Sequence, residues 1–137
     1  MVAQQLYEGV AVGKEGSVGL ITYMRTDSVR IADVAAADIR SYIESEFGKE
    51  FRPSHANSYS SKKNAQDAHE AIRPTSVHRT PLEMAKHLNK DQLKLYSLIW
   101  NRAVASQMAS AVFDVTTLLI GGRRFTNCSA TGLCFEV

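Results

Sequence analysis

The sequence has few of the residues that mark secreted or metal-stabilised proteins. It contains two cysteines, Cys128 and Cys134, and three prolines in 137 residues. Two cysteines in one probable strand region, with no histidine near them, make neither a disulfide framework nor a metal site. We therefore predict that both cysteines are reduced and contribute to packing.

Long apolar runs are also missing. No stretch approaches the roughly 20 apolar residues of a membrane-spanning helix. The first five residues, MVAQQ, lack the basic and apolar blocks of a signal peptide. These absences predict a cytoplasmic protein with no membrane partner.

The composition that remains is ordinary for a soluble globular protein, with 45% hydrophobic and 22% charged residues. The length allows one domain, or one domain and part of another. The net charge of +2 says little, but residues 49–80 hold more basic than acidic side chains. Such a strip could face phosphate groups. A solvated basic loop would have the same composition, and charge alone favours the loop.

Apolar spacing predicts helices over residues 28–47, about 61–72, 80–88 and 90–108. Thr80 with Glu83 forms a capping box, and the sequence from Asn89 restarts a helix in the same way. We expect the first of these helices to bury a stripe of Ile31, Ala35, Ile39, Ile43 and Phe47. The last is expected to bury Leu95, Leu98, Ile99 and Ala103, with Trp100 at the edge of the core.

The character of the chain changes near Ala111. Residues 112–120, 124–130 and 133–137 are predicted strands, separated by turns at Gly121–Gly122 and Thr131–Gly132. A lone three-stranded meander has too little core for a stable domain. The predicted fold class is therefore mainly α (α+β): a helical domain over 1–111, with helix-turn-helix-like units, and part of a β domain over 112–137.

A junction at Tyr23 is the first candidate site. Residues 19–28 (GLITYMRTDS) begin with strand-forming residues and end with three residue types that cap helices. In an extended segment, side chains two apart share a face, so Arg25 and Asp27 lie on the side of Tyr23. A phenol, whose pKa is near ~10, becomes a nucleophile when a cation stabilises its anion. These ten residues alone favour a half-buried strand tyrosine with a capping Asp27 or Ser28.

A second candidate lies on the predicted helix over 61–72. His69 and Arg73 are four residues apart, which would place them on one helical face, with Lys62 upstream. Together they could contact a phosphate, although a surface histidine on a basic helix would look the same. The helix pair at 80–108 allows another class of function, a non-catalytic helix-turn-helix module that binds DNA.

Four segments, taken together, resemble the bacterial type IA DNA topoisomerases. Residues 19–28 resemble the active-site tyrosine motif of that family, and residues 68–75 (AHEAIRPT) resemble its second signature. Residues 3–9 (AQQLYEG) and 95–100 (LYSLIW) match further segments in the same order. The resemblance covers essentially the whole chain, and the first two motifs are highly specific.

The resemblance implies that Tyr23 attacks a DNA phosphodiester and forms a 5′-phosphotyrosine. The strand is later resealed, so that negative supercoils relax without ATP. The implied partner is single-stranded or underwound duplex DNA. Arg25 would pair with the phosphate or the phenolate, and His69 would assist near the scissile phosphate. The weaker candidates for DNA contacts are Thr22, Asp27, Lys62 and Arg73.

The resemblance also implies a Mg²⁺ ion, held by clustered acidic residues in a separate N-terminal TOPRIM domain. No Asp-x-Asp-x-Glu pattern occurs in this sequence, so we predict no metal ligand in it. The chain is expected to be an inactive fragment of a monomeric, cytoplasmic and nucleoid-associated enzyme. Its open β edge is a predicted site of self-association, which leaves an interaction scaffold as a third hypothesis.

Overall fold

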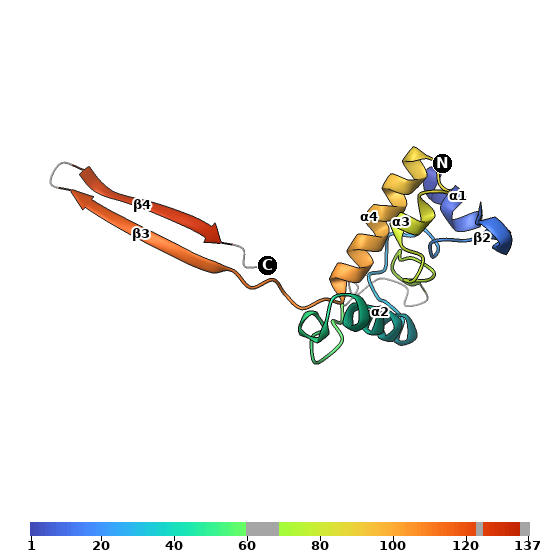
Figure 1. Ribbon diagram of the computed structural model, residues 1–137, viewed down its shortest axis with the longest axis horizontal. Coiled ribbons are helices and arrows are strands. Elements are labelled where there is room, and N and C mark those ends of the chain that lie inside the picture. The colour runs from blue at the N-terminus through green and yellow to red at the C-terminus, as the bar shows by residue number, and fades with distance from the viewer. Residues whose placement is uncertain (60–68, 123–124, 135–137) are drawn as a thin grey trace.

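The computed structural model describes residues 1–59, 69–122 and 125–134. Figure 1 shows a helical body from which a long β hairpin extends away. The helices are α1 (Val2–Glu8), α2 (Asp33–Glu46), α3 (Pro81–Met84) and α4 (Lys90–Ser106), with 3-10 turns η1 (Gly13–Glu15) and η2 (Lys49–Phe51). The strands are β1 (Val10–Ala11), β2 (Ser17–Val18), β3 (Asp114–Gly122) and β4 (Phe125–Cys134).

The mainly helical fold class is confirmed, but the predicted three-stranded meander is wrong. β3 and β4 form one antiparallel hairpin that starts with Asp114 opposite Cys134 and, after a register shift between Ile120 and Gly122, ends with Gly122 opposite Phe125. The predicted turn at Thr131–Gly132 lies inside β4, opposite Thr117 and Thr116. The cross-strand partners of these residues hold them in the ladder, which a local turn signal does not take into account. The domain division at residue 111 stays a prediction.

Helix α4 packs chiefly through aromatic side chains, and its predicted apolar stripe is confirmed in part: Ala103 is buried, and Leu95 and Ile99 are partly buried against the core. Tyr96, Trp100 and Val104 are buried, whereas Leu98 is 56% exposed. The spacing of four residues between each of these buried side chains places the largest apolar surfaces on one face. Trp100, predicted at the edge of the core, is 7% exposed and its ring lies 5.7 Å from that of Tyr42.

The same helix fixes the segment that precedes α3. Trp100 Nε1 donates to the Val77 carbonyl at 2.9 Å, and Tyr96 Oη donates to the Arg79 carbonyl at 2.6 Å. Both predicted capping boxes are confirmed, at Thr80 and at Asn89. These bonds satisfy backbone groups that helix ends leave unpaired, so the path of residues 77–90 is well defined.

Helix α2 begins at Asp33, so the start predicted at Ser28 is wrong. Its first turn is held from a distant segment, because the Ala32 amide donates to a Glu70 carboxylate oxygen at 2.7 Å. Asp27 therefore does not cap this helix. Of the predicted apolar stripe, Ile39 and Ile43 are buried, while Phe47 at the end of the helix is 43% exposed.

The prediction of a helix over about 61–72 is wrong for residues 69–72. Residues 69–73 are not helical, and residues 60–68, including Lys62, lie outside the described residues. The backbone of 69–73 bonds to another segment: the Ala71 amide donates to the Arg30 carbonyl at 2.8 Å, and the Arg73 carbonyl accepts from the Thr22 amide at 2.9 Å. These long-range bonds replace the i to i+4 bonds of a helix.

Tyr96 is expected to make the free energy of unfolding fall at alkaline pH. Burial is the main cause that raises the pKa of Tyr96 to about 12. Arg79 lowers this pKa and Glu83 raises it. A raised folded-state pKa stabilises the fold below the unfolded value near ~10, and this stability is lost as pH rises through about 12. We expect the unfolding free energy of the wild type relative to Tyr96→Phe to fall by about 2 kcal/mol over this range.

Urea unfolding between pH 9 and 12 measures this difference, because titrations common to both proteins cancel. Tyr7→Phe is the matched control, since Tyr7 is 41% exposed. A difference between wild type and Tyr96→Phe that stays constant with pH would contradict the role of Tyr96.

Within the described ranges, no helix is both long enough and apolar enough to cross a membrane.

Candidate functional site

Two segments far apart in the sequence run side by side and build the site. The Thr22 amide donates to the Arg73 carbonyl at 2.9 Å, and the Thr75 amide donates to the Leu20 carbonyl at 3.0 Å. Ile21 and Pro74 form an antiparallel bridge between these bonds. This pairing brings the segment of Tyr23 against the segment of His69.

Gly19 allows helix α1 to approach the same segment. A Cβ at this position would lie 2.6 Å from the Tyr7 carbonyl oxygen, which is far too close. The Leu20 amide can thus donate to the Leu6 carbonyl at 2.7 Å. As a result the Tyr7 ring meets the Tyr23 ring edge-on, with centroids 5.4 Å apart. The close approach of the Tyr7 carbonyl is therefore the reason for glycine at this position.

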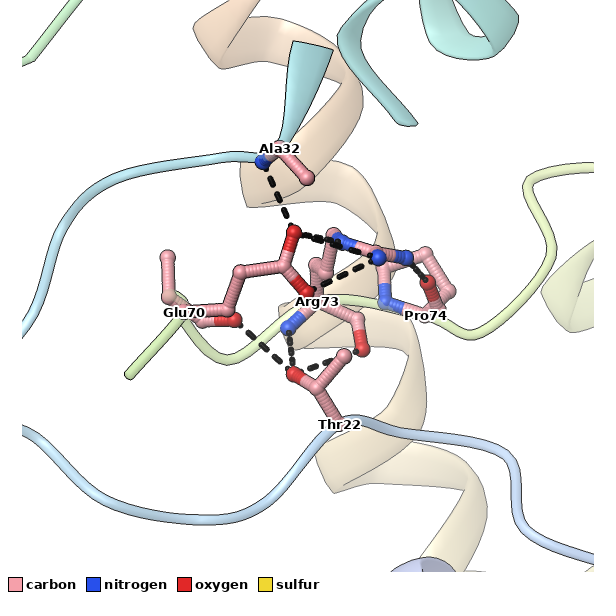
Figure 2. Close-up of polar contacts among 6 residues, drawn as sticks. Thr22, Ala32, Glu70, Arg73 and Pro74 are labelled. Carbon is pink, nitrogen blue, oxygen red and sulfur yellow. Dashed lines mark hydrogen bonds and ion pairs between the residues drawn. The ribbon is translucent and has the colours of Figure 1, made fainter. Parts of the chain in front are cut away.

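A polar network ties the two segments to the start of α2 (Figure 2). Thr22 Oγ1 donates to the Ala71 carbonyl at 2.8 Å and accepts from the Arg73 amide at 3.0 Å. The Glu70 carboxylate accepts from the Ala32 amide and pairs with Arg73 Nη2 at 2.9 Å. Arg73 Nη1 also donates to the Pro74 carbonyl. Thr22 and Arg73 thus hold the backbone on either side of the site.

Tyr23 presents its ring to solvent at the mouth of a pocket. The side chain is 51% exposed. The pocket has a volume of about 310 Å³, and its lining residues are Tyr7, Thr22, Tyr23, His69 and Glu70. The centroid of the His69 ring lies 6.4 Å from that of Tyr23. The phenol is therefore accessible to a large substrate and has polar groups around it.

Arg25, Asp27 and His69 form a cluster beside this pocket. Arg25 Nε lies 2.9 Å from Asp27 Oδ2, and Arg25 Nη1 lies 3.3 Å from His69 Nε2. Because a guanidinium has only donors, His69 Nε2 accepts, which places the ring proton on Nδ1. His69 Nδ1 is buried without a hydrogen-bond partner, 3.9 Å from Asp27 Oδ2. The contact with Arg25 therefore favours the tautomer of His69 that carries its proton on Nδ1.

The charges around Tyr23 are balanced. Arg25 is paired with Asp27, and Arg73 is paired with Glu70. The Arg25 side chain is nevertheless 49% exposed, and only two of the five donors of its guanidinium are used by these partners. The remaining donors can bind an oxyanion in the fork geometry that suits a phosphate.

Ion pairs offset part of the basic charge of residues 49–80, for which composition alone favoured a solvated loop. Arg52 pairs with Glu44, Arg73 with Glu70, and Arg79 with Glu15 at 2.9 Å. These three arginines are thus neutralised by acidic neighbours, two of which lie outside the strip. This arrangement fits a solvated surface better than a continuous phosphate-binding strip.

The residues present do not by themselves fit a Mg²⁺ ion. Over residues 1–59, 69–122 and 125–134, no three His, Cys, Asp or Glu side chains gather closely enough to hold a metal. The carboxylates of Asp27 and Glu70, both in this site, are each engaged by an arginine. Neither is free to serve as one of the several oxygen ligands that Mg²⁺ needs.

Sequence reasoning missed two residues of the site, Tyr7 and Glu70. Tyr7 lines the pocket of Tyr23, and Glu70 joins the pocket to the start of α2. Both lie inside the segments that carry the family resemblance, Tyr7 in residues 3–9 and Glu70 in residues 68–75. Their positions in those motifs were the available signal.

The arrangement defines a helical domain that presents a tyrosine beside an oriented arginine and histidine. Residues 1–133 match the family model described as DNA topoisomerase. The DNA topoisomerase 1 proteins of two strains of Xylella fastidiosa, 9a5c and Temecula1, are each 52% identical to the chain over 118 residues, or 85% of it. A solved structure of full-length topoisomerase I from Thermotoga maritima is 41% identical, with a TM-score of 0.77 over 98% of the chain.

The chain therefore belongs to the bacterial type IA DNA topoisomerase family. It spans 14% of the length of the Xylella relatives and 21% of the Thermotoga chain.

Proposed function

We propose that this chain supplies the nucleophile of a type IA DNA topoisomerase, and that Tyr23 is that nucleophile. One observation carries the proposal: an exposed tyrosine opens into a pocket beside an arginine–histidine pair drawn from two separate segments. Membership of the family supports it. The proposed substrate is single-stranded or underwound duplex DNA, and the complete enzyme is proposed to work as a monomer.

The proposed reaction exchanges one phosphodiester for another. Tyr23 Oη attacks phosphorus and loses its proton, while the bond from phosphorus to the 3′ oxygen breaks and that oxygen takes up a proton. The products are a 5′-phosphotyrosine and a free 3′-hydroxyl. Since the bond energy is kept in the phosphotyrosine, the reverse attack reseals the strand without ATP.

Arg25 and His69 are proposed to act on the phosphate. The unused donors of Arg25 would stabilise the charge that develops on the phosphate oxygens in the transition state. His69 accepts from Arg25, so it can hold the guanidinium in place near the scissile phosphate, and Asp27 pairs with the same guanidinium. Asp27 is proposed to act through Arg25, and a direct DNA contact by Asp27 stays a prediction.

Thr22 and Arg73 are proposed to position the site. Their polar atoms bond to backbone groups and to Glu70, which fixes the spacing between Tyr23 and His69. Direct DNA contacts by Thr22, Arg73 and Lys62 stay predictions. Any Mg²⁺ ion of the complete enzyme would need ligands other than the residues described here. We therefore expect that the isolated chain does not relax supercoiled DNA.

A helix-turn-helix module is the alternative function. Helix α3 is a single turn of four residues, Pro81–Met84, next to the 17 residues of α4. A helix so short offers little of the two-helix geometry on which such modules rely. The alternative would be favoured if DNA binding were salt-dependent but unchanged by substitution of Tyr23, Arg25 or His69.

The polarity of cleavage tests the proposed chemistry. The full-length enzyme is incubated with Mg²⁺ and one oligonucleotide labelled at its 5′ or its 3′ end, and the reaction is stopped with denaturant. We expect only the 3′-labelled half to remain attached to protein, because its 5′ phosphate is joined to tyrosine. Attachment of the 5′-labelled half would contradict a 5′-phosphotyrosine.

A further inference from the structure

A second pocket, which Tyr23 does not line, includes Arg25 in its lining. It has a volume of about 320 Å³ and mainly apolar walls, formed by Val29, Ile31, Ile72 and Tyr59. Arg25 lines this pocket and bonds to His69, which lines the pocket of Tyr23. The two pockets are therefore linked by the contact between Arg25, which we assign to the scissile phosphate, and His69.

Tyr59 is held as a fixed wall of this pocket. Its hydroxyl donates to the Ser106 carbonyl at 2.9 Å, at the end of α4. Asn57 Nδ2 donates to the Ser106 carbonyl at 2.9 Å and to the Met108 carbonyl at 3.1 Å. Gln107 Nε2 donates to the Asn57 carbonyl at 3.0 Å. These bonds pin residues 57–59, yet the Tyr59 side chain stays 46% exposed, so an anchored aromatic ring is available to a ligand.

The charge at this pocket favours an anionic ligand. Among the residues that the structure describes, no Asp or Glu lines it, whereas Arg25, Arg73 and Arg102 do. Arg73 is engaged by Glu70, and Arg25 is shared with the site of Tyr23. Arg102 is exposed and forms no ion pair or side-chain hydrogen bond with any part of the chain that the structure describes. An exposed arginine beside apolar walls suits a ligand that carries both a flat ring and a phosphate.

We propose that this second pocket binds a nucleoside of the DNA strand that stays attached to Tyr23, within two positions downstream of the scissile phosphate. The base would stack on Tyr59, and the next phosphate would pair with Arg102. The inference rests on the proposed function, because a 5′-phosphotyrosine leaves the downstream strand on this chain. Aromatic rings and arginines are the groups that bind single strands without strict sequence choice.

A comparison of Tyr59→Leu with Tyr59→Phe tests this stacking. The full-length enzyme is titrated with a fluorescent single-stranded oligonucleotide, without Mg²⁺, and with matched strands that carry one abasic site. Leucine removes the aromatic face, whereas phenylalanine keeps the ring and removes only the hydrogen bond to Ser106. We expect Tyr59→Leu to bind the intact strand about tenfold more weakly, and Tyr59→Phe to bind it as the wild type does.

The abasic strands show where the base lies. At one of the first two downstream positions, an abasic site should weaken wild-type binding about tenfold and leave the affinity of Tyr59→Leu unchanged. An abasic site upstream should weaken both proteins equally. Arg102→Gln should weaken binding to every strand and reduce the salt dependence by about one phosphate contact.

Three results would overturn the proposal. Equal losses for Tyr59→Leu and Tyr59→Phe would show that Tyr59 only caps α4. Abasic effects that add to the Tyr59→Leu effect at every position would show that no base stacks there. Loss of binding to a protein partner, with DNA affinity unchanged, would assign the pocket to that partner. All three are measured by binding alone, so they are distinguishable from a failure of Tyr23 to cleave.

Discussion

Tyr23→Phe is expected to abolish DNA cleavage and relaxation in the full-length enzyme. The substitution keeps the ring, which packs edge-on against Tyr7, and removes only the oxygen that we propose attacks phosphorus. Loss of a covalent nucleophile lowers rates by on the order of 10⁴- to 10⁶-fold. Plasmid relaxation and trapping of the DNA adduct in denaturant both measure the loss. Non-covalent binding of single-stranded DNA should stay within about twofold of the wild type.

Tyr7→Phe is the matched control for this prediction. It removes a hydroxyl from the ring that faces Tyr23 in the same pocket, with centroids 5.4 Å apart. We expect it to form the covalent adduct at a rate within about tenfold of the wild type. If Tyr7→Phe lost the adduct and Tyr23→Phe kept it, the nucleophile would be Tyr7.

Glu70→Ala is expected to have the largest effect on stability. Its carboxylate accepts from the Ala32 amide and pairs with Arg73, and both side chains are mostly buried, with 24% and 16% exposed. Alanine leaves a partly buried guanidinium and a helix-start amide without their partner. Because removal of one member of a buried pair costs about 3–5 kcal/mol and this pair is partly solvated, we expect a loss of about 2–3 kcal/mol.

Urea unfolding measures this loss as a lower transition midpoint. Glu44→Ala is the control, because the Glu44–Arg52 pair is exposed and such pairs contribute only about 0–1 kcal/mol. We also expect Glu70→Ala to slow cleavage, since the segment of His69 loses its anchor. Equal midpoints for the two variants would contradict the bridging role of Glu70.

Local signals predicted those parts of the fold that are made by neighbouring residues. The capping boxes at Thr80 and Asn89 form as their spacing of three residues required. The helix predicted to end at residue 47 ends at Glu46, and Gly48 follows with a φ of 110°, which few other residues adopt. Each of these features depends on contacts within a few residues, which a single sequence displays directly.

Long-range contacts account for the parts that the sequence could not predict. Residues 69–73 have helical spacing, but their backbone groups bond to Thr22 and Arg30. The first turn of α2 starts at Asp33 because a carboxylate from Glu70 meets the Ala32 amide. No local pattern contains this information, since each bond joins residues roughly 40 or more positions apart.

Residue spacing and the family motif each predicted a different part of the candidate site. Spacing alone placed Arg25 and Asp27 beside Tyr23, but it favoured a capping role for Asp27, which the ion pair with Arg25 replaces. His69 came from the family motif, and the geometry now places it within 3.3 Å of Arg25. The pocket at Tyr59 had no local signal, because the bonds that hold it join residues 57–59 to the end of α4.

The central claim is that Tyr23 becomes covalently linked to DNA. The most direct measurement is to trap the adduct of the full-length enzyme, digest it with protease and nuclease, and locate the modified peptide by mass spectrometry. This sequence holds five tyrosines that the method can distinguish. We predict a nucleotide on the peptide that contains Tyr23, joined through its 5′ phosphate. A nucleotide on any other residue, with Tyr23 unmodified, would contradict the account.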